Sequence, residues 1–481
     1  KPYVDYFNSM EDENIAQAVP NARASQWMEE NIPLFECSQK NFEEMYYYRW
    51  WTLRKHIKET PVGYGMTEFL VNRSYADKYN LIACAIGHHI YESRWLRNPE
   101  YLNQIIHTWY RGNEGGPMAK MTKFSSWNAD AVLGRYMVDG NKEFLLDMVK
   151  DLEAEYARWE KTNRLSNGLY WQGDVQDGME ESISGGRRKQ YARPTINSYM
   201  YGNAKALSLI GIMTGDEGMA MKYGLKADSI KTLVQDKLWN TDHHFFETMR
   251  GDASAEVREA IGYIPWYFNL PDASSQYDVA WKEVMDEKGF SAPYGLTTAE
   301  RRHPEFRTHG VGKCEWDGAI WPFASAQTLT AMANFMNNYP QTVLTDSVYF
   351  HQMERYVESQ HHRGRPYIGE YLDEVTGYWL KGDQERSRYY NHSTFNDLMI
   401  TGLIGLRPRM DNTVEVNPLI PEGKWDYFCL DNVLYHGRNL TILWDKDGSR
   451  YQRGKGLHIY VDGKEVGHAD TLTRVFCENV L

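Results

Sequence analysis

The chain has 481 residues, of which 42% are hydrophobic and 14% aromatic, and it carries a formal net charge of −12. This length predicts one large domain with a smaller second one, and the apolar fraction is enough for a large core. The acidic balance, without any run of Lys and Arg, argues against nucleic-acid and anionic-membrane partners, and no apolar stretch is long enough to span a bilayer.

Residues 1–38 are polar and weakly patterned, so we expect a leader or cap there. From about residue 39 apolar residues recur with a 3.6-residue period, which is typical of amphipathic helices. In the segment 195–213, for example, Ile196, Leu207 and Ile210 fall on one face. The pattern predicts about twelve helices, at 39–57, 77–96, 99–111, 124–137, 141–163, 195–213, 216–238, 258–268, 273–287, 319–337, 344–361 and 393–404.

These predicted helices come in pairs, joined alternately by short turns and by long aromatic loops. Loops of such length within a compact domain usually carry function. Six helical hairpins in a ring, an (α/α)6 toroid with a pocket at one end, fit this order, and we predict that fold for residues 39–410. A superhelical repeat array is the competing architecture, but no fixed sequence period supports it. The long loops are residues 61–76, 164–194, 288–318 and 362–392.

After Pro408 the pattern changes from helical to strand-like. Short runs of β-branched and aromatic residues are separated by turn residues, and the dipeptides Asp447-Gly448 and Asp462-Gly463 are of the kind favoured in hairpins. We therefore predict a small antiparallel β domain over residues 411–481, packed on the helical one. Its expected strands are 414–416, 427–430, 440–444 and 457–461.

The segment 172–184 is a glycine-flanked acidic loop that leads into the predicted helix at 195–213. Aromatic residues and Arg193 lie beside it, and Pro194 marks the start of the helix. Sites that hydrolyse glycosidic bonds combine aromatic platforms with two carboxyl groups, one protonated and one ionised. The carboxyl groups of this loop belong to Asp174, Asp177, Glu180 and Glu181.

Two other segments combine carboxyl groups with aromatic residues. Residues 367–379 place Glu370 ahead of a Thr-Gly turn and two further aromatic residues. Residues 314–323 open the predicted helix at 319–337 with two tryptophans and an aspartate. Because glycoside hydrolysis needs a pair of carboxyl groups, these segments are the candidates for supplying the partner of the acidic loop.

Three motifs, taken in order, resemble those of the six-hairpin glycosidases of glycoside hydrolase family 63 and the related mannosylglycerate-hydrolase-like domains. Asp177-Gly-Met-Glu180 falls in register with the segment that ends in that family's general acid. Trp316-Asp-Gly-Ala-Ile-Trp321 resembles its Trp-x-Gly-Pro-x-Trp segment, and Glu370-Tyr-Leu-Asp-Glu-Val-Thr-Gly377 resembles its general-base motif. The likeness spans roughly residues 60–408. The chain departs from the family by Glu at the acid position, by Ala319 in place of Pro, and by the loss of Asn and Pro from the base motif.

The resemblance implies an inverting glycoside hydrolase, exo-acting on an α-linked oligosaccharide or glycoside, without cofactor or metal. Glu180 is then the general acid and Glu370 the general base that activates water, with their carboxyl groups roughly 6.5–9.5 Å apart. Glu180 requires a raised pKa, from burial or from a neighbouring carboxylate. Asp177 is the rival for the acid, and it fits a turn-forming residue before Gly178 as well.

Residues in and around these motifs are expected to bind the carbohydrate. For Arg193, an ion pair with a loop carboxylate and a contact with the ligand are equally expected. Buried tryptophan is common, so we expect at least one of the three motif tryptophans in the core. Asn197 either points at the pocket or packs in its helix. The expected binding residues are Trp171, Arg193, Asn197, Trp316, Asp317, Trp321, Trp379 and, from the loop 61–76, Glu68.

Two other functions stay open at this point. A polysaccharide lyase or sugar epimerase on the same toroid would rely on Tyr or His bases, which the carboxylate motifs do not favour. A glycan-binding protein without catalytic activity would bind sugar equally well when both glutamates are replaced. His89 and Glu92 share a helix face, but no third ligand is evident, so we expect no metal site.

The remaining sequence features concern the compartment. The chain begins at Lys1 rather than Met, and it carries three Asn-x-Ser/Thr sequons. We expect a secreted or periplasmic protein from which a signal peptide has been removed. Five scattered cysteines without a CxxC pair favour neither a zinc site nor a redox motif, and they leave room for one or two disulfides.

Overall fold

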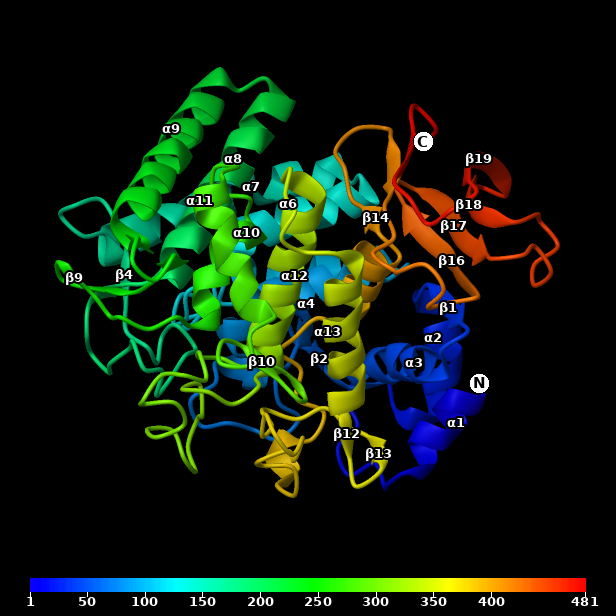
Figure 1. Cartoon of the computed structure of the whole chain (residues 1–481), viewed down its shortest axis with the longest axis horizontal. Coiled ribbons are helices and arrows are strands. Elements are labelled where there is room, and N and C mark those ends of the chain that lie inside the picture. The colour runs from blue at the N-terminus through cyan, green and yellow to red at the C-terminus, as the bar shows by residue number, and fades with distance from the viewer.

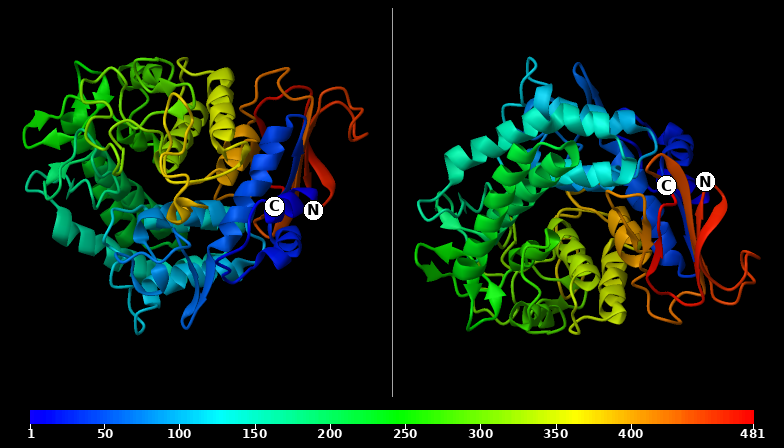
Figure 2. Two further views of the ribbon diagram at one scale, coloured as in Figure 1. Left: turned by 90° about the horizontal axis from the view of Figure 1, so that it is seen from below. Right: turned by 90° about the horizontal axis from the view of Figure 1, so that it is seen from above.

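The structure, a computed structural model, describes residues 1–481. Most of the chain before residue 404 is helical or loop, and the helices follow one another in chain order around a centre, from blue through green to orange (Figure 2). The longer helices are α3 (Lys40–Lys55), α4 (Ile86–Ser93), α5 (Pro99–Arg111), α6 (Asn128–Asp139), α7 (Lys142–Asn163), α8 (Pro194–Thr214), α9 (Glu217–Leu233), α12 (Pro322–Asn338) and α13 (Asp346–Ser359).

The α8–α9 hairpin shows how the sequence sets these boundaries. Pro194 occupies the first turn of α8, where its missing N–H costs nothing. Gly215 ends α8 with φ 73°, a left-handed conformation that glycine adopts without strain. Asp216 then caps α9 by accepting a hydrogen bond from the N–H of Met219. One glycine and one capping aspartate therefore reverse the chain within a single tight turn.

Four predicted helices are broken or shortened in the structure. The segment 77–96 becomes helical only from Ile86, because Tyr79 and Asn80 have φ values of 64° and 63°, which no helix admits. Residues 258–287 form 3-10 turns and two four-residue helices, α10 (Ile264–Tyr267) and α11 (Ser275–Asp278). The last predicted helix shrinks to α14 (Asn396–Leu398), followed by one π turn.

The predicted antiparallel sheet at the C-terminus is confirmed. Five strands pair in the order β1-β16-β17-β18-β19, all antiparallel (Figure 1). The strands from the C-terminal segment are β16 (Tyr427–Tyr435), β17 (Arg438–Asp445), β18 (Gly456–Val461) and β19 (Lys464–Ala469). A smaller sheet joins β14 (Leu406–Arg407), β15 (Val414–Val416) and β20 (Val475–Cys477).

Two tight hairpins connect these strands, and one of them was not predicted. His436-Gly437 joins β16 to β17, and Asp462-Gly463 joins β18 to β19; all four residues have φ between 49° and 79°, as type I′ turns require. The hairpin predicted at Asp447-Gly448 forms between β17 and β18, although not with a two-residue turn. That dipeptide lies inside the longer connection 446–455, where the Asp445 carboxylate accepts the N–H of Gly448.

The N-terminal segment, expected to be a leader or cap, contributes two helices and a strand. Helices α1 (Pro2–Ser9) and α2 (Ala24–Asn31) pack on α3, and β1 (Leu34–Cys37) pairs with β16. The first part of the chain therefore completes the sheet formed by the last part. The boundaries predicted at residues 38 and 410 stay a prediction.

One continuous apolar core runs from the helices into the sheet. Trp425 carries it across the junction, since its ring packs against Phe42 of α3 and Phe350 of α13. The five cysteines are all free thiols, so the structure contains none of the possible disulfides. No helix combines the length and apolar composition needed to cross a bilayer.

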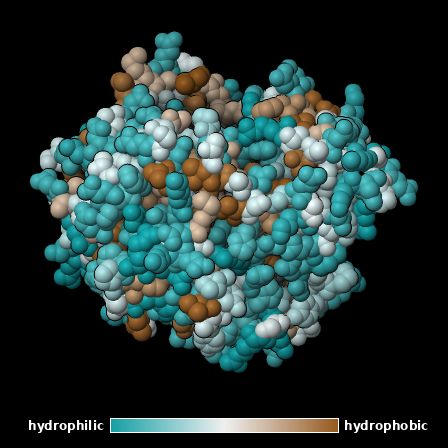
Figure 3. Space-filling model, in the orientation of Figure 1, coloured by the Kyte–Doolittle hydropathy of each residue, from teal (hydrophilic) through white to brown (hydrophobic).

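The outer surface is mostly hydrophilic on the face seen in Figure 3. Apolar residues gather over the outer end of the α8–α9 hairpin, where Ile212, Met221 and Leu225 are exposed. Single exposed apolar side chains elsewhere are ordinary for a protein of this size.

Candidate active site

Three glutamates from distant parts of the chain meet in one cavity of about 300 Å³. Glu68 comes from the loop before α4, Glu180 from the loop before α8, and Glu370 from the loop after α13. We call it the three-glutamate cavity. Its other lining residues are Tyr75, Ile82, Cys84, Lys123, Phe124, Val175, Gly178, Cys314, Trp316, Trp321, Lys381, Arg386 and Tyr390.

A buried ion pair fixes the loop that carries Glu180. The Arg193 Nε lies 2.8 Å from Asp177 Oδ2, and both side chains are completely buried. Ser125 donates to the other Asp177 oxygen at 3.0 Å, and the Thr195 hydroxyl donates as well. With both oxygens hydrogen-bonded in this way, Asp177 holds the loop against the first turn of α8.

Gly178 lets the loop turn beside the cavity. Its φ of 74° favours glycine, and a Cβ there would lie 2.8 Å from the Cys84 sulfur. The N–H of Met179 closes the turn by donating to the carbonyl of Asp174 at 2.9 Å. This turn brings the next residue, Glu180, to the cavity wall.

Glu180 has the environment of a proton donor. Burial raises its pKa to about 7; the negative charges of Glu370 and Asp174 act in the same direction. The indole N–H of Trp316 donates to Glu180 Oε2 at 3.2 Å, which favours the carboxylate and works against the rise. At neutral pH a substantial fraction of Glu180 therefore holds a proton.

A stack of aromatic rings stands behind Glu180. Trp316 and Trp321 stack with centroids 4.2 Å apart and planes 19° apart, and Phe323 continues the stack at 4.4 Å from Trp321. Because Trp321 caps the start of α12, the stack is anchored to a rigid helix. The Trp316 N–H is thus held in a fixed position toward the carboxyl group.

Glu370 lies among cations. Lys381 Nζ is 3.6 Å and an Arg386 nitrogen 3.5 Å from Glu370 Oε2. Two backbone hydrogen bonds between Ile320 and Leu372, of 3.1 and 3.0 Å, tie the Glu370 loop to the tryptophan segment. Two of the three sequence motifs are therefore joined through their main chains.

Glu68 is the third carboxyl group of the cavity. Its Oε1 accepts the hydroxyl of Tyr390 at 3.0 Å, and burial raises its pKa to about 8. It is therefore mostly protonated at neutral pH and can donate a hydrogen bond to a sugar hydroxyl. The Coulombic effect of Glu370 and Glu180 contributes to this rise.

The structure does not bring all predicted residues to the cavity. The guanidinium of Arg193 donates hydrogen bonds to Asp177, Ser182 and Ser184. Asn197 bonds both the N–H and the carbonyl of Tyr170, each at 2.8 Å, and so ties the loop to α8. Neither side chain lines the cavity. Of the two expectations for Arg193, the ion pair is the one observed.

Three other predicted residues also lie outside the cavity lining. Asp317 accepts the backbone N–H groups of residues 309 and 310, and so shapes its own loop. Trp379 is buried and donates to the carbonyls of residues 359 and 361; Trp316 and Trp321 are buried in the same core, but they also line the cavity. Trp171 lies in β4 (Trp171–Gln172), which pairs with β5 (Tyr191–Ala192).

The cations of the cavity were not predicted. Lys381 and Arg386 follow the Glu370 motif on the same loop, and Lys123 comes from the segment before α6. A lysine or arginine in a polar loop has no periodicity that distinguishes a cavity residue from a solvated one. Tyr390 was not predicted either, because only its hydrogen bond to Glu68 in the folded structure shows that it belongs to the cavity.

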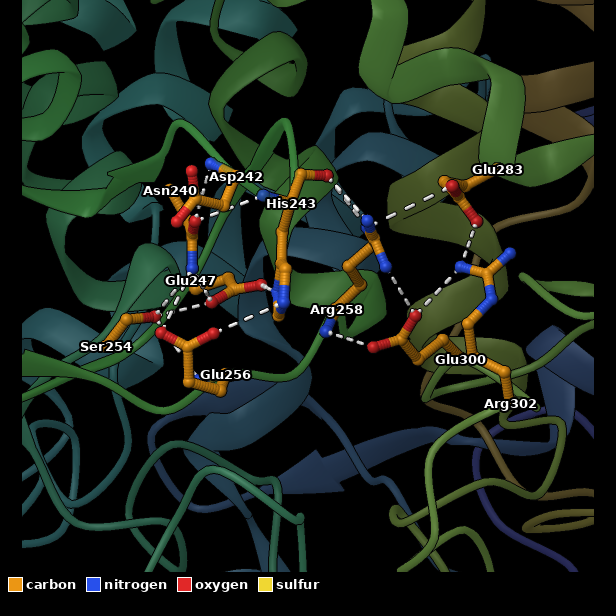
Figure 4. Close-up of polar contacts among 10 residues, drawn as sticks. All are labelled: Asn240, Asp242, His243, Glu247, Ser254, Glu256, Arg258, Glu283, Glu300 and Arg302. Atoms are coloured by element: carbon orange, nitrogen blue, oxygen red, sulfur yellow. Dashed lines mark hydrogen bonds and ion pairs between the residues drawn. The ribbon is translucent and has the colours of Figure 1, made fainter.

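A second polar cluster, drawn in Figure 4, contributes no residue to this cavity. His243, Glu247 and Glu256 place three potential ligand atoms within 4.8 Å of one another. Both ring nitrogens of His243 already face a carboxylate, at 2.6 Å and 3.2 Å. Glu247 also accepts from Asn240 and Ser254, so its oxygens and the His243 ring are already engaged in hydrogen bonds within the cluster.

Comparison with known proteins identifies the class of the chain. Residues 78–393 match the family described as the mannosylglycerate hydrolase MGH1-like glycoside hydrolase domain, and residues 406–468 match the C-terminal domain of glycosyl hydrolase family 65. The class is that of the glycosidases. The chain belongs to the mannosylglycerate hydrolase MGH1-like glycoside hydrolase family.

Solved structures add a near relative and more distant ones. A protein named sialidase is 84% identical with a TM-score of 0.99; the match covers all of this chain but 44% of that one. The mannosylglycerate hydrolase of Thermus thermophilus, in complex with Tris and D-glycerate, is 10% identical with a TM-score of 0.57, over 74% of this chain and 98% of that one. A family 78 rhamnosidase of Bacillus sp. GL1 is 11% identical with a TM-score of 0.59, over 86% of this chain and 40% of that one.

Proposed function

We propose that the chain is an inverting glycoside hydrolase on an (α/α)6 toroid, with Glu180 as general acid and Glu370 as general base. One observation carries the proposal: two glutamates from separate motifs line the same small cavity, and the pKa of Glu180 is raised to about 7. The toroid is supported by the order of the helices around a centre and by the TM-score to the family 63 hydrolase.

The proposed reaction follows from these positions. Glu180 donates its proton to the glycosidic oxygen as the bond to the anomeric carbon breaks. Glu370 takes a proton from a water molecule whose oxygen attacks that carbon from the opposite face. Glu68 and the cations are then available to hold sugar hydroxyl groups. The reaction consumes one water, and the configuration at the anomeric carbon is inverted.

The size of the cavity supports exo action. About 300 Å³ is at the lower end of small-ligand sites and suits roughly one sugar residue. The α linkage is proposed from the resemblance of the motifs alone. A series of aryl glycosides in both anomeric forms tests the linkage, and proton NMR of the first-formed sugar tests the stereochemistry. Retention of configuration, or release of an unsaturated sugar that absorbs in the ultraviolet, contradicts the proposal.

The pH dependence of activity is expected to show the proton on Glu180. Its pKa is raised from the ordinary range to about 7, so the acid form is complete well below pH 7 and is lost above it. We expect kcat/KM to fall about tenfold per pH unit above pH 7. Rate measurements between pH 5 and pH 9 on a stable aryl glycoside test this, and a rate that keeps rising above pH 8 speaks against Glu180 as acid.

Replacing Trp316 by phenylalanine should shift the fall of kcat/KM above pH 7, the alkaline limb of the pH profile. The indole N–H stabilises the carboxylate form, so its removal raises the pKa of Glu180 further and shifts the limb to higher pH. Trp379→Phe is the matched control, because it removes an indole N–H that bonds only backbone carbonyls elsewhere. A limb that stays in place in Trp316→Phe, or that moves equally in both variants, contradicts the expected effect.

A second candidate is hydrolysis of a sialoside, favoured by the 84% identity to the protein named sialidase. Lys123, Lys381 and Arg386 line the cavity and suit a carboxylated sugar. The match covers 44% of that protein, however, so the name sialidase also refers to parts outside the matched region. Release of sialic acid from an umbelliferyl sialoside by this chain alone supports the second candidate, and no release removes it.

A further inference from the structure

A second cavity, of about 590 Å³, lies toward the other end of the helices that lead away from the candidate active site. Trp321, at the start of α12, and the loop just before α8 line the three-glutamate cavity. The later halves of the same helices, from Tyr201 and from Thr330 onward, line the second one. The two cavities share no lining residue, and the volume of the second is well inside the range of small-ligand sites.

The second cavity is basic, although the chain as a whole has a net charge of −12. Its basic side chains outnumber its acidic ones, so it favours a negatively charged occupant. The basic residues are Arg94, Lys205, Lys231, Arg407 and Arg409, and the acidic residues are Asp130, Asp397 and Glu415.

Two of these cations have no carboxylate partner. Arg94, Lys231 and Arg409 each have a carboxylate oxygen within 2.9 Å. Arg407 and Lys205 form no ion pair, and Lys205 makes no hydrogen bond either. Lys205 lies at the exposed part of the lining, whereas Arg407 is deeper. The unpaired positive charge is therefore spread over the depth of the cavity.

Of the two unpaired cations, Arg407 gives the stronger evidence for a bound anion. It donates to the carbonyl of Thr401 at 3.0 Å and to Asn334 Oδ1 at 2.7 Å, both neutral oxygens. A guanidinium has five N–H donors, so three are left. Burial lowers the pKa of Arg407, although the charges of Glu415 and Asp397 act against the fall, so the cost of desolvating its charge is only partly compensated. A bound anion would supply that compensation, and a planar acid group fits a guanidinium well.

The rest of the lining suits a sugar ring. Tyr91, Tyr201, Tyr267 and Phe268 offer aromatic surface beside the polar groups. Such rings pack against the apolar faces of sugars, while hydroxyl and amide groups bond their hydroxyls. Desolvation raises the pKa of Asp130 to about 7, so part of the cavity's own negative charge is neutralised at neutral pH.

We propose that this second cavity binds a small acidic saccharide, a sugar that carries a carboxylate or a phosphate. Its acid group contacts Arg407, Lys205 adds positive charge at the exposed part of the cavity, and its ring lies against the aromatic side chains. The site is separate from the three-glutamate cavity, so its occupation does not depend on hydrolysis.

Calorimetric titration of the whole chain at pH 7 tests this, with D-glucuronate and D-glucose 6-phosphate as probes and D-glucose as the neutral comparison. We expect both acids to bind, and glucose to bind at least about tenfold more weakly. Arg407→Gln is expected to weaken acid binding about tenfold or more. Lys205→Glu should weaken it roughly three- to tenfold, because that position is exposed.

Lys222→Glu is the matched control for charge, since Lys222 is an exposed lysine of α9 outside the cavity. Glu180→Gln tests whether the acids bind in the three-glutamate cavity instead, and it should bind them as the wild type does. If Arg407→Gln fails to fold by circular dichroism, Lys205→Glu decides alone.

Three results overturn the proposal: equal affinity for glucose and the acids, equal affinity in Lys205→Glu and Lys222→Glu, or no binding of either acid. Inorganic phosphate bound as tightly as glucose 6-phosphate would also overturn it, because the site would then recognise an anion without its sugar.

Discussion

Glu180→Gln is expected to lower kcat about 10³-fold on a glycoside with a poor leaving group, and far less on the dinitrophenyl glycoside of the same sugar. The difference arises because a dinitrophenolate leaves without a proton, so the general acid is no longer needed. Glu370→Gln should lower kcat about 10³-fold on both substrates, since water still has to be deprotonated in either case. Steady-state kinetics of both variants on both substrates separate the two roles.

Glu385→Gln is the control for these variants. Glu385 is exposed on the loop that also carries Arg386, and its side chain makes no hydrogen bond or ion pair. Its kcat should stay within about threefold of the wild type. If Glu180→Gln loses activity equally on both substrates, Glu180 is not the acid. If Glu370→Gln stays active, another group activates the water.

Arg193→Met is expected to lower the free energy of unfolding by about 3–5 kcal/mol, because it leaves the buried Asp177 carboxylate without its cation. Activity should fall too, since the Glu180 loop loses its anchor to α8. The midpoint of denaturant unfolding, followed by tryptophan fluorescence, measures the stability. Arg187→Met removes an arginine from the same loop, but Arg187 is 62% exposed and pairs with Glu181 at the surface. That control should change stability by no more than about 1 kcal/mol.

Asp177→Asn separates the two roles that the sequence left open for this aspartate. If Asp177 only fixes the loop, the variant is less stable but keeps the alkaline limb near pH 7. If Asp177 is the acid, the limb disappears and the dinitrophenyl glycoside restores the activity. The closed set of hydrogen bonds around Asp177 favours the first result.

The elements best predicted from the sequence are those whose ends carry their own signals. The spacing predicted a helix at 99–111, and α5 has these bounds, with Asn98 as its cap and Pro99 in its first turn. The helix predicted at 195–213 differs from α8 by one residue at each end. Strong periodicity and local capping do not depend on the rest of the fold, so a single sequence can reveal them.

Other features depend on contacts across the chain and could not be predicted. The hairpin of β2 (Ile57–Thr60) and β3 (Gly63–Met66) is too short to show a period. Trp316 and Trp379 belong to the same residue type and are both buried, yet the indole N–H of Trp316 donates to Glu180 and that of Trp379 to a backbone carbonyl. The path of its loop decides which group each tryptophan contacts. That path depends on contacts between distant residues, such as the backbone hydrogen bonds between Ile320 and Leu372.

The pairing of β1 with β16 has a consequence for how the molecule is made. Leu34 lies opposite Asp431, so this ladder closes a loop of almost the whole chain. During synthesis β1 is translated well before β16, and it has no partner until the helical region between the two strands has left the ribosome. In that interval the backbone N–H and C=O groups of β1 are unpaired and can pair with a strand of another chain. The nascent chain is thus the species most open to aggregation, and a chaperone that shields β1 until β16 has been made would raise the yield of folded protein.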